Sequence, residues 1–297
     1  MRIAILGVGG VGGYIGARLK LSGKDEITFI TRGRQLETIK KNGLKLIDEN
    51  EEYIVKPDFI TDNPKDLGIF DFIIIAVKSY DLRHALELIN SNVSRKTILL
   101  PLLNGVSHDK EIKEIYKEAK VLNGCIYILS NIKSPGIIKK YGGVFNLIFG
   151  TTEFSLESLA GIKKLFDNAK LKNRLTDDIE FETWKKYLLI SAYASLTSYY
   201  KKPMGYIVQN HLEELREVLI EIKNVANEKG IPLKNKNIEK IILQAKNIPY
   251  DSKTSMQLDF EKGKKTELEA LCGYIVKEAK NLNITISIMK KIYLQLK

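Results

Sequence analysis

The sequence of 297 residues contains little cysteine and little histidine. Its two cysteines, Cys125 and Cys272, lie far apart, with no Cys-x-x-Cys pair and no histidine cluster nearby. This pattern excludes a disulfide framework and gives no ligand spacing for zinc, so we predict no metal site. Both cysteines are expected to be small buried side chains in a reducing compartment.

Long hydrophobic runs are also missing. The longest uncharged stretch, 3–17, has fifteen residues, and six of them are glycine. A membrane-spanning helix takes about 20 mainly apolar residues, so this stretch does not predict one. No small-residue cleavage site follows it, which argues against a signal peptide. We therefore predict a cytoplasmic protein with no membrane partner.

The formal charge of +11 is not concentrated in any one segment. Residues 1–170 carry 25 basic and 20 acidic side chains, and residues 171–297 carry 22 and 16. Like charges form no long block, so no nucleic-acid partner is predicted. A diffuse positive field suits small anions, such as a dinucleotide and a carboxylate substrate.

Strand and helix patterns alternate in the first part of the chain. Continuous apolar runs, typical of strands buried on both faces, cover 2–6, 27–31, 71–77 and 97–103. Helical patterns cover 10–22, 35–43, 81–89 and 108–118. The alternation predicts an α/β fold with a Rossmann-type, doubly wound parallel sheet. Further strand patterns at 121–129, 136–142 and 145–150 predict that this sheet ends in antiparallel strands.

The rest of the chain is mainly helical. Its helical patterns cover 155–169, 182–200, 211–229, 236–247 and 266–282, with a short one near 285–296. We place the domain boundary near residue 170, in the stretch 171–178. This gives a dinucleotide-binding domain over 1–170 and an all-helical substrate and catalytic domain over 171–297.

A glycine motif lies between the first strand pattern and the first helix pattern. Gly7, Gly9 and Gly12 form Gly-x-Gly-x-x-Gly, which permits a tight turn, close approach of a pyrophosphate and close helix packing. The N–H groups and dipole of the helix N-terminus then favour the negative diphosphate. The candidate dinucleotide-binding loop is Gly7, Val8, Gly9, Gly10, Val11 and Gly12.

The residues after the second strand pattern bear on the choice of dinucleotide. NAD-binding proteins usually carry Asp or Glu about 20 residues after the glycine motif, where it holds the ribose 2′-hydroxyl. This sequence has Thr31 and Arg32 there, with Arg34 behind them and no acid. Because a guanidinium makes paired hydrogen bonds to a phosphate, Arg32 favours NADPH/NADP+.

Further motifs extend along almost the whole chain. They are TRGRQLETIKKNGLKL (31–46), AVKSYDL (76–82), LLNGV (102–106), TWKKYL (183–188) and SMQLDFEKGKKTELEAL (255–271). Together with the glycine loop they resemble the ketopantoate reductases, or 2-dehydropantoate 2-reductases. The last motif is the most specific, because it is not a general feature of dinucleotide-binding folds. The resemblance implies hydride transfer from NADPH to the C2 ketone of ketopantoate, giving pantoate for pantothenate and coenzyme A synthesis.

The resemblance also assigns roles to single residues. It makes Lys186 the general acid, with Glu267 beside it and Ser255 near the substrate carboxylate. It places Asn104 at the nicotinamide end, in contact with cofactor and substrate. On the cofactor side it implies Lys78, Ser130 and also Glu267. An ammonium suits the reaction, since it stabilises the negative charge that grows on the ketone oxygen and then donates a proton.

Helical periodicity does not choose between the adjacent lysines Lys185 and Lys186. Apolar residues share the helix face of each, and the following stretch 187–200 is uncharged. The resemblance selects Lys186; without it, a solvated lysine is the ordinary interpretation. Likewise, Glu267 alone would be read as an acid that complements a helix dipole. For Trp184 we predict core packing.

The sequence departs from the family where substrate-binding asparagines are usual. Those positions hold residues without an amide, namely Ile190, Ala194, Met204 and Cys272. Candidate substitutes are the hydroxyls of Ser191, Tyr193, Ser195 and Thr197. The substrate is therefore ketopantoate held differently or another 2-oxo acid.

Two other functions remain as alternatives. One is a different two-domain dehydrogenase, such as a glycerol-phosphate type, although the helical part has only Arg174 and Arg216 for a phosphate. The other is an NADPH-sensing module without turnover, which would have no need of Lys186 as a proton donor. The sequence does not determine the oligomeric state, and a homodimer is one of the alternatives.

Overall fold

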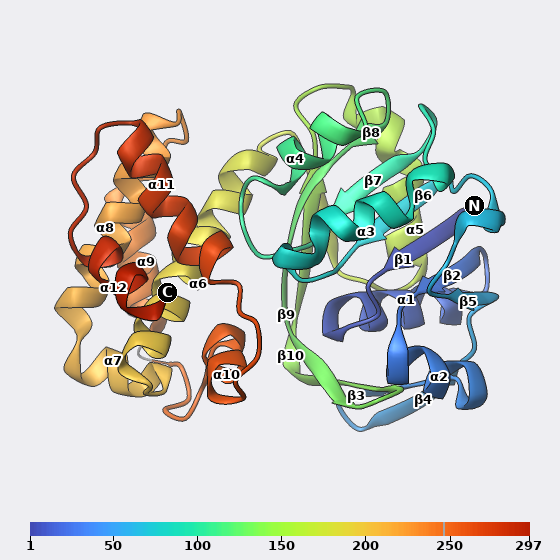
Figure 1. Ribbon diagram of the computed structural model, residues 1–297, viewed down its shortest axis with the longest axis horizontal. Coiled ribbons are helices and arrows are strands. Elements are labelled where there is room, and N and C mark those ends of the chain that lie inside the picture. The colour runs from blue at the N-terminus through green and yellow to red at the C-terminus, as the bar shows by residue number, and fades with distance from the viewer. Residues whose placement is uncertain (246) are drawn as a thin grey trace. The chain divides into compact units, whose positions relative to one another are not determined.

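The computed structural model describes residues 1–245 and 247–297, which form two compact units (Figure 1). The N-terminal unit comprises Met1–Leu103 and Ser107–Ile179, and the C-terminal unit comprises Asn104–Val106 and Glu180–Lys297. The division after Ile179 differs from the predicted boundary near residue 170, because the stretch 171–178 contains a strand of the first unit. Within the described residues, no helix combines the length and the apolarity needed to cross a membrane.

A six-stranded parallel sheet, in the order β5-β2-β1-β6-β7-β8, forms the centre of the N-terminal unit. Its strands are β1 (Arg2–Leu6), β2 (Glu26–Ile30), β5 (Phe59–Thr61), β6 (Phe72–Ile75), β7 (Ile98–Pro101) and β8 (Lys120–Val121). The four strands predicted from apolar runs are confirmed as β1, β2, β6 and β7. In β1, Ile3 and Ile5 enter one hydrophobic cluster while Ala4 and Leu6 enter another. The apolar runs are continuous because successive side chains enter cores on opposite faces of the sheet.

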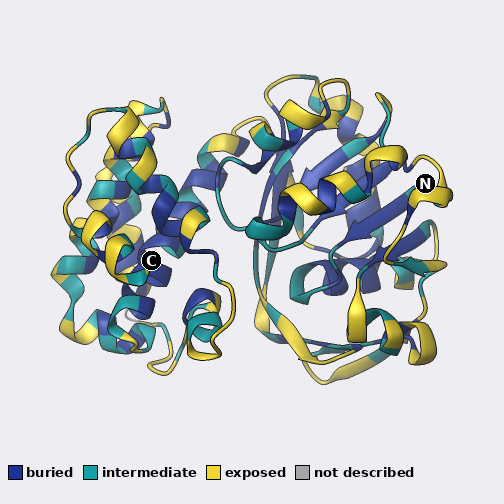
Figure 2. Ribbon diagram, viewed as in Figure 1, coloured by how far each residue is buried: buried dark blue, intermediate teal, exposed yellow. Residues whose placement is uncertain are grey.

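Helices cover both faces of this sheet, which is buried between them (Figure 2). The helices of the unit are α1 (Gly10–Ser22), α2 (Gly33–Asn42), α3 (Leu82–Leu88), α4 (His108–Ile115) and α5 (Ala160–Asn168). Side chains of α1 and α5 belong to the cluster on one face, and those of α3 and α4 to the cluster on the other. The predicted doubly wound fold is thus confirmed. The helical pattern at 155–169, which precedes the predicted boundary, contributes α5 to this unit.

The strands predicted over 121–150 belong mainly to a second, mixed sheet, so the expectation that they end the parallel sheet as antiparallel strands is wrong. This sheet has the order β11-β10-β3-β4, with β9 paired to β10. Its strands are β3 (Leu44–Asp48), β4 (Glu51–Val55), β9 (Asn123–Ser134), β10 (Ile137–Gly150) and β11 (Asn173–Thr176). Helix α1 packs between the two sheets, and glycine makes this possible. A Cβ at Gly16 would lie 2.6 Å from Phe29 of β2, and one at Gly13 would lie 2.7 Å from Ile138 of β10.

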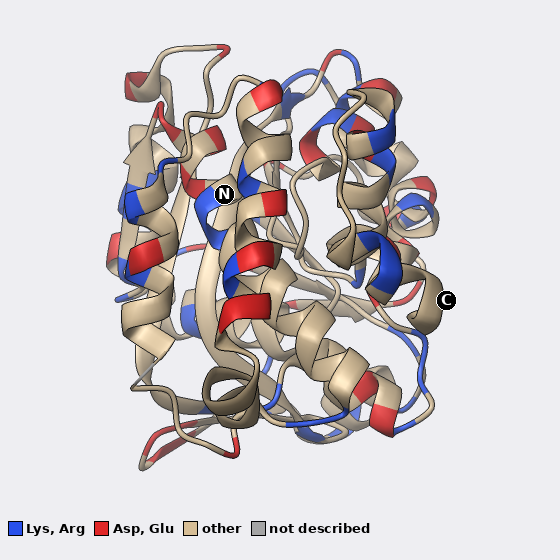
Figure 3. Ribbon diagram, turned by 90° about the vertical axis from the view of Figure 1, so that its left-hand side faces the viewer, with Lys and Arg blue, Asp and Glu red and all other residues tan. Residues whose placement is uncertain are grey.

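The C-terminal unit is all-helical in its described residues, as predicted. Its helices are α6 (Ile179–Tyr200), α7 (Met204–Asn210), α8 (Leu212–Glu228), α9 (Asn235–Ala245), α10 (Ser255–Glu261), α11 (Tyr274–Asn281) and α12 (Ile288–Leu296). The predicted helix 236–247 includes residue 246, which lies outside the described residues. Acidic and basic residues are interspersed along these helices (Figure 3).

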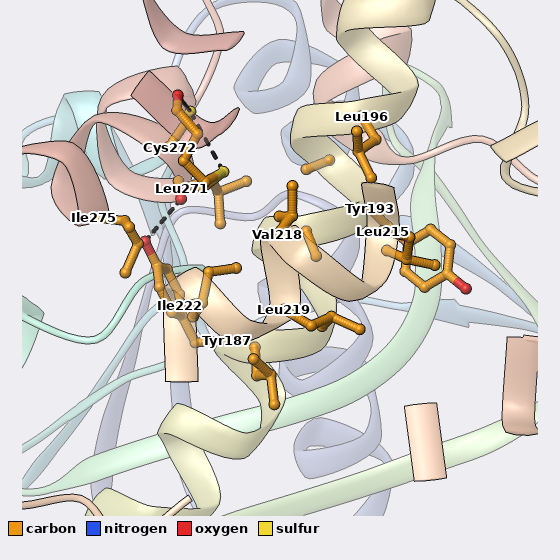
Figure 4. Packing of buried hydrophobic residues seen from close by; sticks show 14 of the residues in the cluster. Tyr187, Tyr193, Leu196, Leu215, Val218, Leu219, Ile222, Leu271, Cys272 and Ile275 are labelled. Carbon is orange, nitrogen blue, oxygen red and sulfur yellow. Dashed lines mark hydrogen bonds between the residues drawn. The ribbon is translucent and has the colours of Figure 1, made fainter. Parts of the chain in front are cut away.

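Helix α6 is the centre of the helical core, which explains why its residues 187–200 carry no charge. Leu188, Ala192 and Leu196 are fully buried in a cluster that also contains Leu215 and Leu219 of α8 (Figure 4). Trp184 is 5% exposed and belongs to the same cluster, so its predicted role in core packing is confirmed.

Candidate functional site

The glycine motif forms the turn between β1 and α1. Gly7 has a φ of +95°, a conformation that side chains disfavour, and its N–H donates to Ile30 of β2 at 3.0 Å. A Cβ at Gly12 would lie 2.0 Å from the carbonyl oxygen of Gly7, so only glycine allows this approach. At Gly9, by contrast, an added Cβ would meet no atom within 4 Å. The turn therefore packs closely against neighbouring atoms at Gly7 and Gly12. It is open at Gly9, directly before the N-terminus of α1.

Residues from two other elements support this turn. Ser130 of β9 donates its hydroxyl to the Gly10 carbonyl at 3.0 Å, and a Cβ at Gly10 would collide with the Ser130 carbonyl. Gln35 of α2 donates to the Val8 carbonyl at 2.9 Å and accepts from the N–H of Gly136 at 2.8 Å. The structure thus brings the predicted residue Ser130 to the glycine loop. Gln35 was missed, because an exposed-looking glutamine in a helical pattern carries no signal of a contact with distant backbone.

Arg32 and Lys78 are both connected to one turn at the carboxyl end of β6. The guanidinium of Arg32 forms an ion pair with Asp81 at 2.8 Å, and its side chain is 68% exposed. Asp81 ends the short 3₁₀ turn Ser79–Asp81 that follows Lys78, and its N–H donates to the Lys78 carbonyl at 2.9 Å. Asp81 therefore directs Arg32 along the edge where the strands of the parallel sheet end, the usual ligand edge of such folds.

In the C-terminal unit, Lys186, Asn104 and Glu267 form a line of hydrogen bonds. The ammonium Nζ of Lys186 donates to the Oδ1 of Asn104 at 3.0 Å. The Nδ2 of Asn104 donates in turn to the Oε2 of Glu267 at 3.3 Å. Lys186 is 8% exposed and Glu267 is 3% exposed, so cation and anion are both withdrawn from water. In this environment, charge-assisted hydrogen bonds are stronger than on an open surface.

Three separate segments position these side chains. Lys186 belongs to the first half of α6, and Asn104 lies in the segment Asn104–Val106, which follows β7 in sequence but groups with the helical unit. Glu267 directly precedes the helical segment that begins at Leu268 and continues into α11. The position before a helix also favours a carboxylate, as the sequence alone suggested.

The neighbouring Lys185 has a different environment. It forms an ion pair with Glu182, one turn earlier on α6, and its side chain is 33% exposed. Its ammonium also lies over the ring of Phe181, 5.7 Å from the centroid. Lys185 therefore has the contacts of an ordinary helix-surface lysine, whereas Lys186 is buried against a polar group from another segment.

Ser255 lies on a different element, helix α10. Ser255 is the exposed first residue of α10, and the preceding Thr254 caps that helix. The Thr254 hydroxyl lies 2.9 Å from that of Thr197 on α6. Thr197 is about three helical turns, or roughly 16 Å, beyond Lys186. The start of α10 therefore contacts α6 near Thr197 and not near Lys186.

Two of the hydroxyls considered as substitutes for the missing asparagines have protein partners. Ser191 donates to the Leu271 carbonyl at 2.6 Å, and Thr197 donates to the Tyr193 carbonyl at 2.7 Å. The hydroxyl of Tyr193 is buried without a hydrogen-bond partner among the described residues. Ala194 is 2% exposed within the hydrophobic core. Ser191, Ala194 and Thr197 are therefore buried in the helical unit and expose almost no surface.

Two family models match the chain. One, described as "Ketopantoate reductase PanE/ApbA", matches residues 3–153, and its C-terminal counterpart, "Ketopantoate reductase PanE/ApbA C terminal", matches residues 178–297. The chain belongs to the ketopantoate reductase family. The family is one of NADP-dependent oxidoreductases that reduce 2-oxo acids, and its cofactor is NADPH.

Single relatives are similar over almost their full length. The uncharacterized oxidoreductase YkpB of Bacillus subtilis is 30% identical over 100% of this chain and 98% of its own length. The 2-dehydropantoate 2-reductase of Pyrococcus horikoshii is 29% identical over 96% of this chain and 92% of its own. Among solved structures, the 2-dehydropantoate 2-reductase of Porphyromonas gingivalis superimposes with a TM-score of 0.88, at 28% identity over 100% of this chain and 99% of its own. The whole ketopantoate reductase fold is therefore present.

The glycine loop fits the dinucleotide that this family uses. Its only open glycine, among those of the motif, is Gly9, which directly precedes the N-terminus of α1. A diphosphate is stabilised at such a position by backbone N–H groups and the helix dipole. Arg32 supplies a cation near the end of β2, where a 2′-phosphate is bound in folds of this class.

Proposed function

We propose that this protein catalyses the NADPH-dependent reduction of 2-dehydropantoate to (R)-pantoate, in pantothenate and coenzyme A biosynthesis. The observation that carries the proposal is the buried line of hydrogen bonds from Lys186 through Asn104 to Glu267. A protein that only sensed NADPH would have no use for a buried ammonium held by an amide and a carboxylate.

In the proposed reaction, Lys186 is the general acid. Its ammonium stabilises the negative charge that develops on the C2 oxygen and then donates a proton to it. Asn104 holds the ammonium in one direction, because its carbonyl accepts from Lys186 while its amide group donates to Glu267. The Glu267 carboxylate fixes the orientation of the amide and adds a negative charge that favours the protonated lysine. Ser255 is kept as the proposed ligand of the substrate carboxylate; this role requires the start of α10 to move toward Lys186, because Thr254 contacts Thr197 about three helical turns away.

We assign cofactor binding to the residues predicted from the sequence. These are the loop Gly7, Val8, Gly9, Gly10, Val11 and Gly12, together with Arg32, Lys78, Asn104, Ser130 and Glu267. When bound, NADPH supplies the hydride that adds to C2 of the substrate. The loop residues hold the diphosphate through backbone N–H groups, and Arg32 binds the 2′-phosphate.

A second candidate is a reductase of another 2-oxo acid. It is favoured by Ile190, Ala194 and Met204, which offer no amide where the family commonly has asparagine. A 2-oxo acid with an apolar side chain would lose nothing there, whereas the 4-hydroxyl of ketopantoate would lose hydrogen-bond partners.

The test is a steady-state assay of NADPH oxidation with ketopantoate and with a set of 2-oxo acids that differ in side-chain polarity. We expect turnover with ketopantoate and pantoate as the product. A higher kcat/KM for an apolar 2-oxo acid would support the second candidate. NADPH binding without oxidation by any 2-oxo acid would contradict both candidates and favour a sensing module.

A further inference from the structure

The helical segment after Glu267 contains a widened turn. Residues Glu269–Gly273 form a π-helical turn, in which the N–H of Tyr274 donates to the carbonyl of Glu269 instead of that of Ala270. Directly before it, the N–H of Leu271 donates to the Glu267 carbonyl at 3.0 Å, as in an ordinary α-helix. Single π turns are rare in proteins, and those that occur are often found at functional sites. This one therefore requires an explanation.

The π turn determines the direction of Glu267. In an α-helix, each residue adds about 100° of rotation and about 1.5 Å of rise. Conversion of the π turn to a regular α turn would therefore rotate Glu267 by about 100° relative to α11. A rotation of that size would remove its carboxylate from the Nδ2 of Asn104, which lies 3.3 Å away.

Two hydroxyls from α6 bind the carbonyls of the π turn. The hydroxyl of Tyr187 donates to Leu271 at 2.8 Å and lies 3.1 Å from the carbonyl of Ala270 (Figure 4). The hydroxyl of Ser191 donates to the same Leu271 carbonyl at 2.6 Å. Both side chains are fully buried, with exposures of 1% and 0%. These hydroxyls add hydrogen bonds to the carbonyls of the π turn, where the Ala270 carbonyl does not accept from the N–H of Tyr274.

The two hydroxyls come from the helix that carries Lys186. Tyr187 is the next residue along α6, and Ser191 lies one turn further on the same face. The ring of Tyr187 also packs edge-on against Tyr274, the residue that closes the π turn, with centroids 6.1 Å apart. Burial raises the pKa of the Tyr187 hydroxyl well above its ordinary value, so it remains a donor at all physiological pH values.

We propose that Tyr187 and Ser191 are positioning residues that fix the π turn and thereby hold the Glu267 carboxylate against Asn104 and Lys186. The proposal rests on the reductase activity proposed above. Through these two hydroxyls, the helix that supplies the ammonium also sets the direction of the carboxylate. Neither side chain touches the reacting groups in this scheme; both act through Glu267.

The kinetic test uses Tyr187→Phe, which keeps the ring, Ser191→Ala and the double variant. The double variant is expected to lower kcat about 10- to 100-fold, as small misplacements of catalytic groups do, with KM for the 2-oxo acid changed less than about 3-fold. Matched controls on the same helix are Tyr200→Phe, which loses a hydroxyl bond to Glu214, and Ser198→Ala, a buried serine. Wild-type kcat in the double variant, or an equal loss in the controls, would overturn the proposal.

A mutant cycle with Glu267→Gln separates positioning from a general effect on the fold. If the hydroxyls act through Glu267, their removal causes little further loss of kcat in the Glu267→Gln background. A merely structural role predicts the same fold-loss in both backgrounds, and that result would refute the assignment.

A crystal structure of the double variant provides a readout that needs no activity. We expect the segment 269–273 to lose its π-helical hydrogen bond and the Glu267 carboxylate to leave Asn104. An unchanged π turn with Glu267 still bound to Asn104 would contradict the proposal. Absence of turnover in the wild-type protein would refute the reductase activity, while this structure would still decide whether the hydroxyls position Glu267.

Discussion

The ammonium of Lys186 and the side-chain carbonyl of Asn104 lie 3.0 Å apart, although 82 residues separate them in the sequence. An amide suits this position because one end accepts from a cation and the other end donates to an anion. With Glu267 on its donor side, Asn104 therefore has a single favourable orientation. This contact distinguishes Lys186 from Lys185, whereas the sequence pattern alone does not distinguish the two lysines.

Replacement of Asn104 tests this bridging role. Asn104→Ala should lower kcat by about 10- to 100-fold, since a hydrogen bond to a charged group contributes about 1.5–3 kcal/mol. Asn104→Asp keeps the size of the side chain but places a second carboxylate against Glu267, so it should not restore the rate. The measurement is steady-state kcat with the preferred 2-oxo acid. Near wild-type turnover of Asn104→Asp would show that the amide donor is not needed.

The glycine loop gives a prediction that separates binding from folding. Gly9→Ala should leave the melting temperature unchanged, because an added Cβ meets no protein atom within 4 Å, but should weaken NADPH binding at least tenfold. Gly12→Ala should also lower the melting temperature, because its Cβ would lie 2.0 Å from the Gly7 carbonyl. Thermal unfolding and fluorescence titration with NADPH measure both effects. Unweakened NADPH binding by Gly9→Ala would exclude a diphosphate at this turn.

The cofactor preference depends on Arg32. Arg32→Ala should weaken NADPH binding about 10- to 100-fold and NADH binding less than about 3-fold, because only NADPH carries the 2′-phosphate. Arg34→Ala is the matched control, a nearby exposed arginine that should change neither affinity much. Equal losses for the two dinucleotides would refute recognition of the 2′-phosphate by Arg32.

Strands buried on both faces were predictable from sequence, and the second sheet was less so. Ile3, Ile5 and their neighbours in β1 form an unbroken apolar run because both faces of the strand are covered. In β4, Glu51 and Glu52 are exposed, so that strand has no such run. The antiparallel strands at 121–150 were recognised as strands, but local pattern does not reveal which sheet a strand joins.

Site residues were predictable where a motif requires a particular residue type. They were not predictable where contacts between distant segments determine a residue's environment. The steric need for Gly7 and Gly12 follows from the glycine motif. The burial of Lys186 against Asn104 depends on a segment from after β7, which periodicity along α6 does not show. The contacts of Gln35 and the π turn held by Tyr187 depend on partners distant in sequence. The resemblance to ketopantoate reductases identified Lys186 and Glu267 as candidate site residues, which local sequence pattern alone did not.

The buried thiol of Cys272 and the buried hydroxyl of Tyr193 predict that the protein loses stability at alkaline pH. Burial raises the pKa of Cys272 from 9.0 to about 12 and that of Tyr193 from 10.0 to about 12. Above pH 9.0 the unfolded chain loses protons that the folded chain keeps, so the stability present below that pH declines up to about pH 12. Denaturant midpoints measured from pH 8 to 11 should therefore fall, and less steeply in Tyr193→Phe. Midpoints that stay constant over this range would contradict the burial of these groups.

The central claim is that Lys186 is the general acid, and paired lysine variants test it most directly. At neutral pH, with ketopantoate and NADPH, Lys186→Ala should lower kcat by at least about 100-fold, the range that positioned acid catalysis supplies. Lys185→Ala should stay within about 3-fold of wild type, since Lys185 pairs with Glu182 of its own helix and its side chain is 33% exposed. Wild-type turnover by Lys186→Ala, or an equal loss in both variants, would contradict the account.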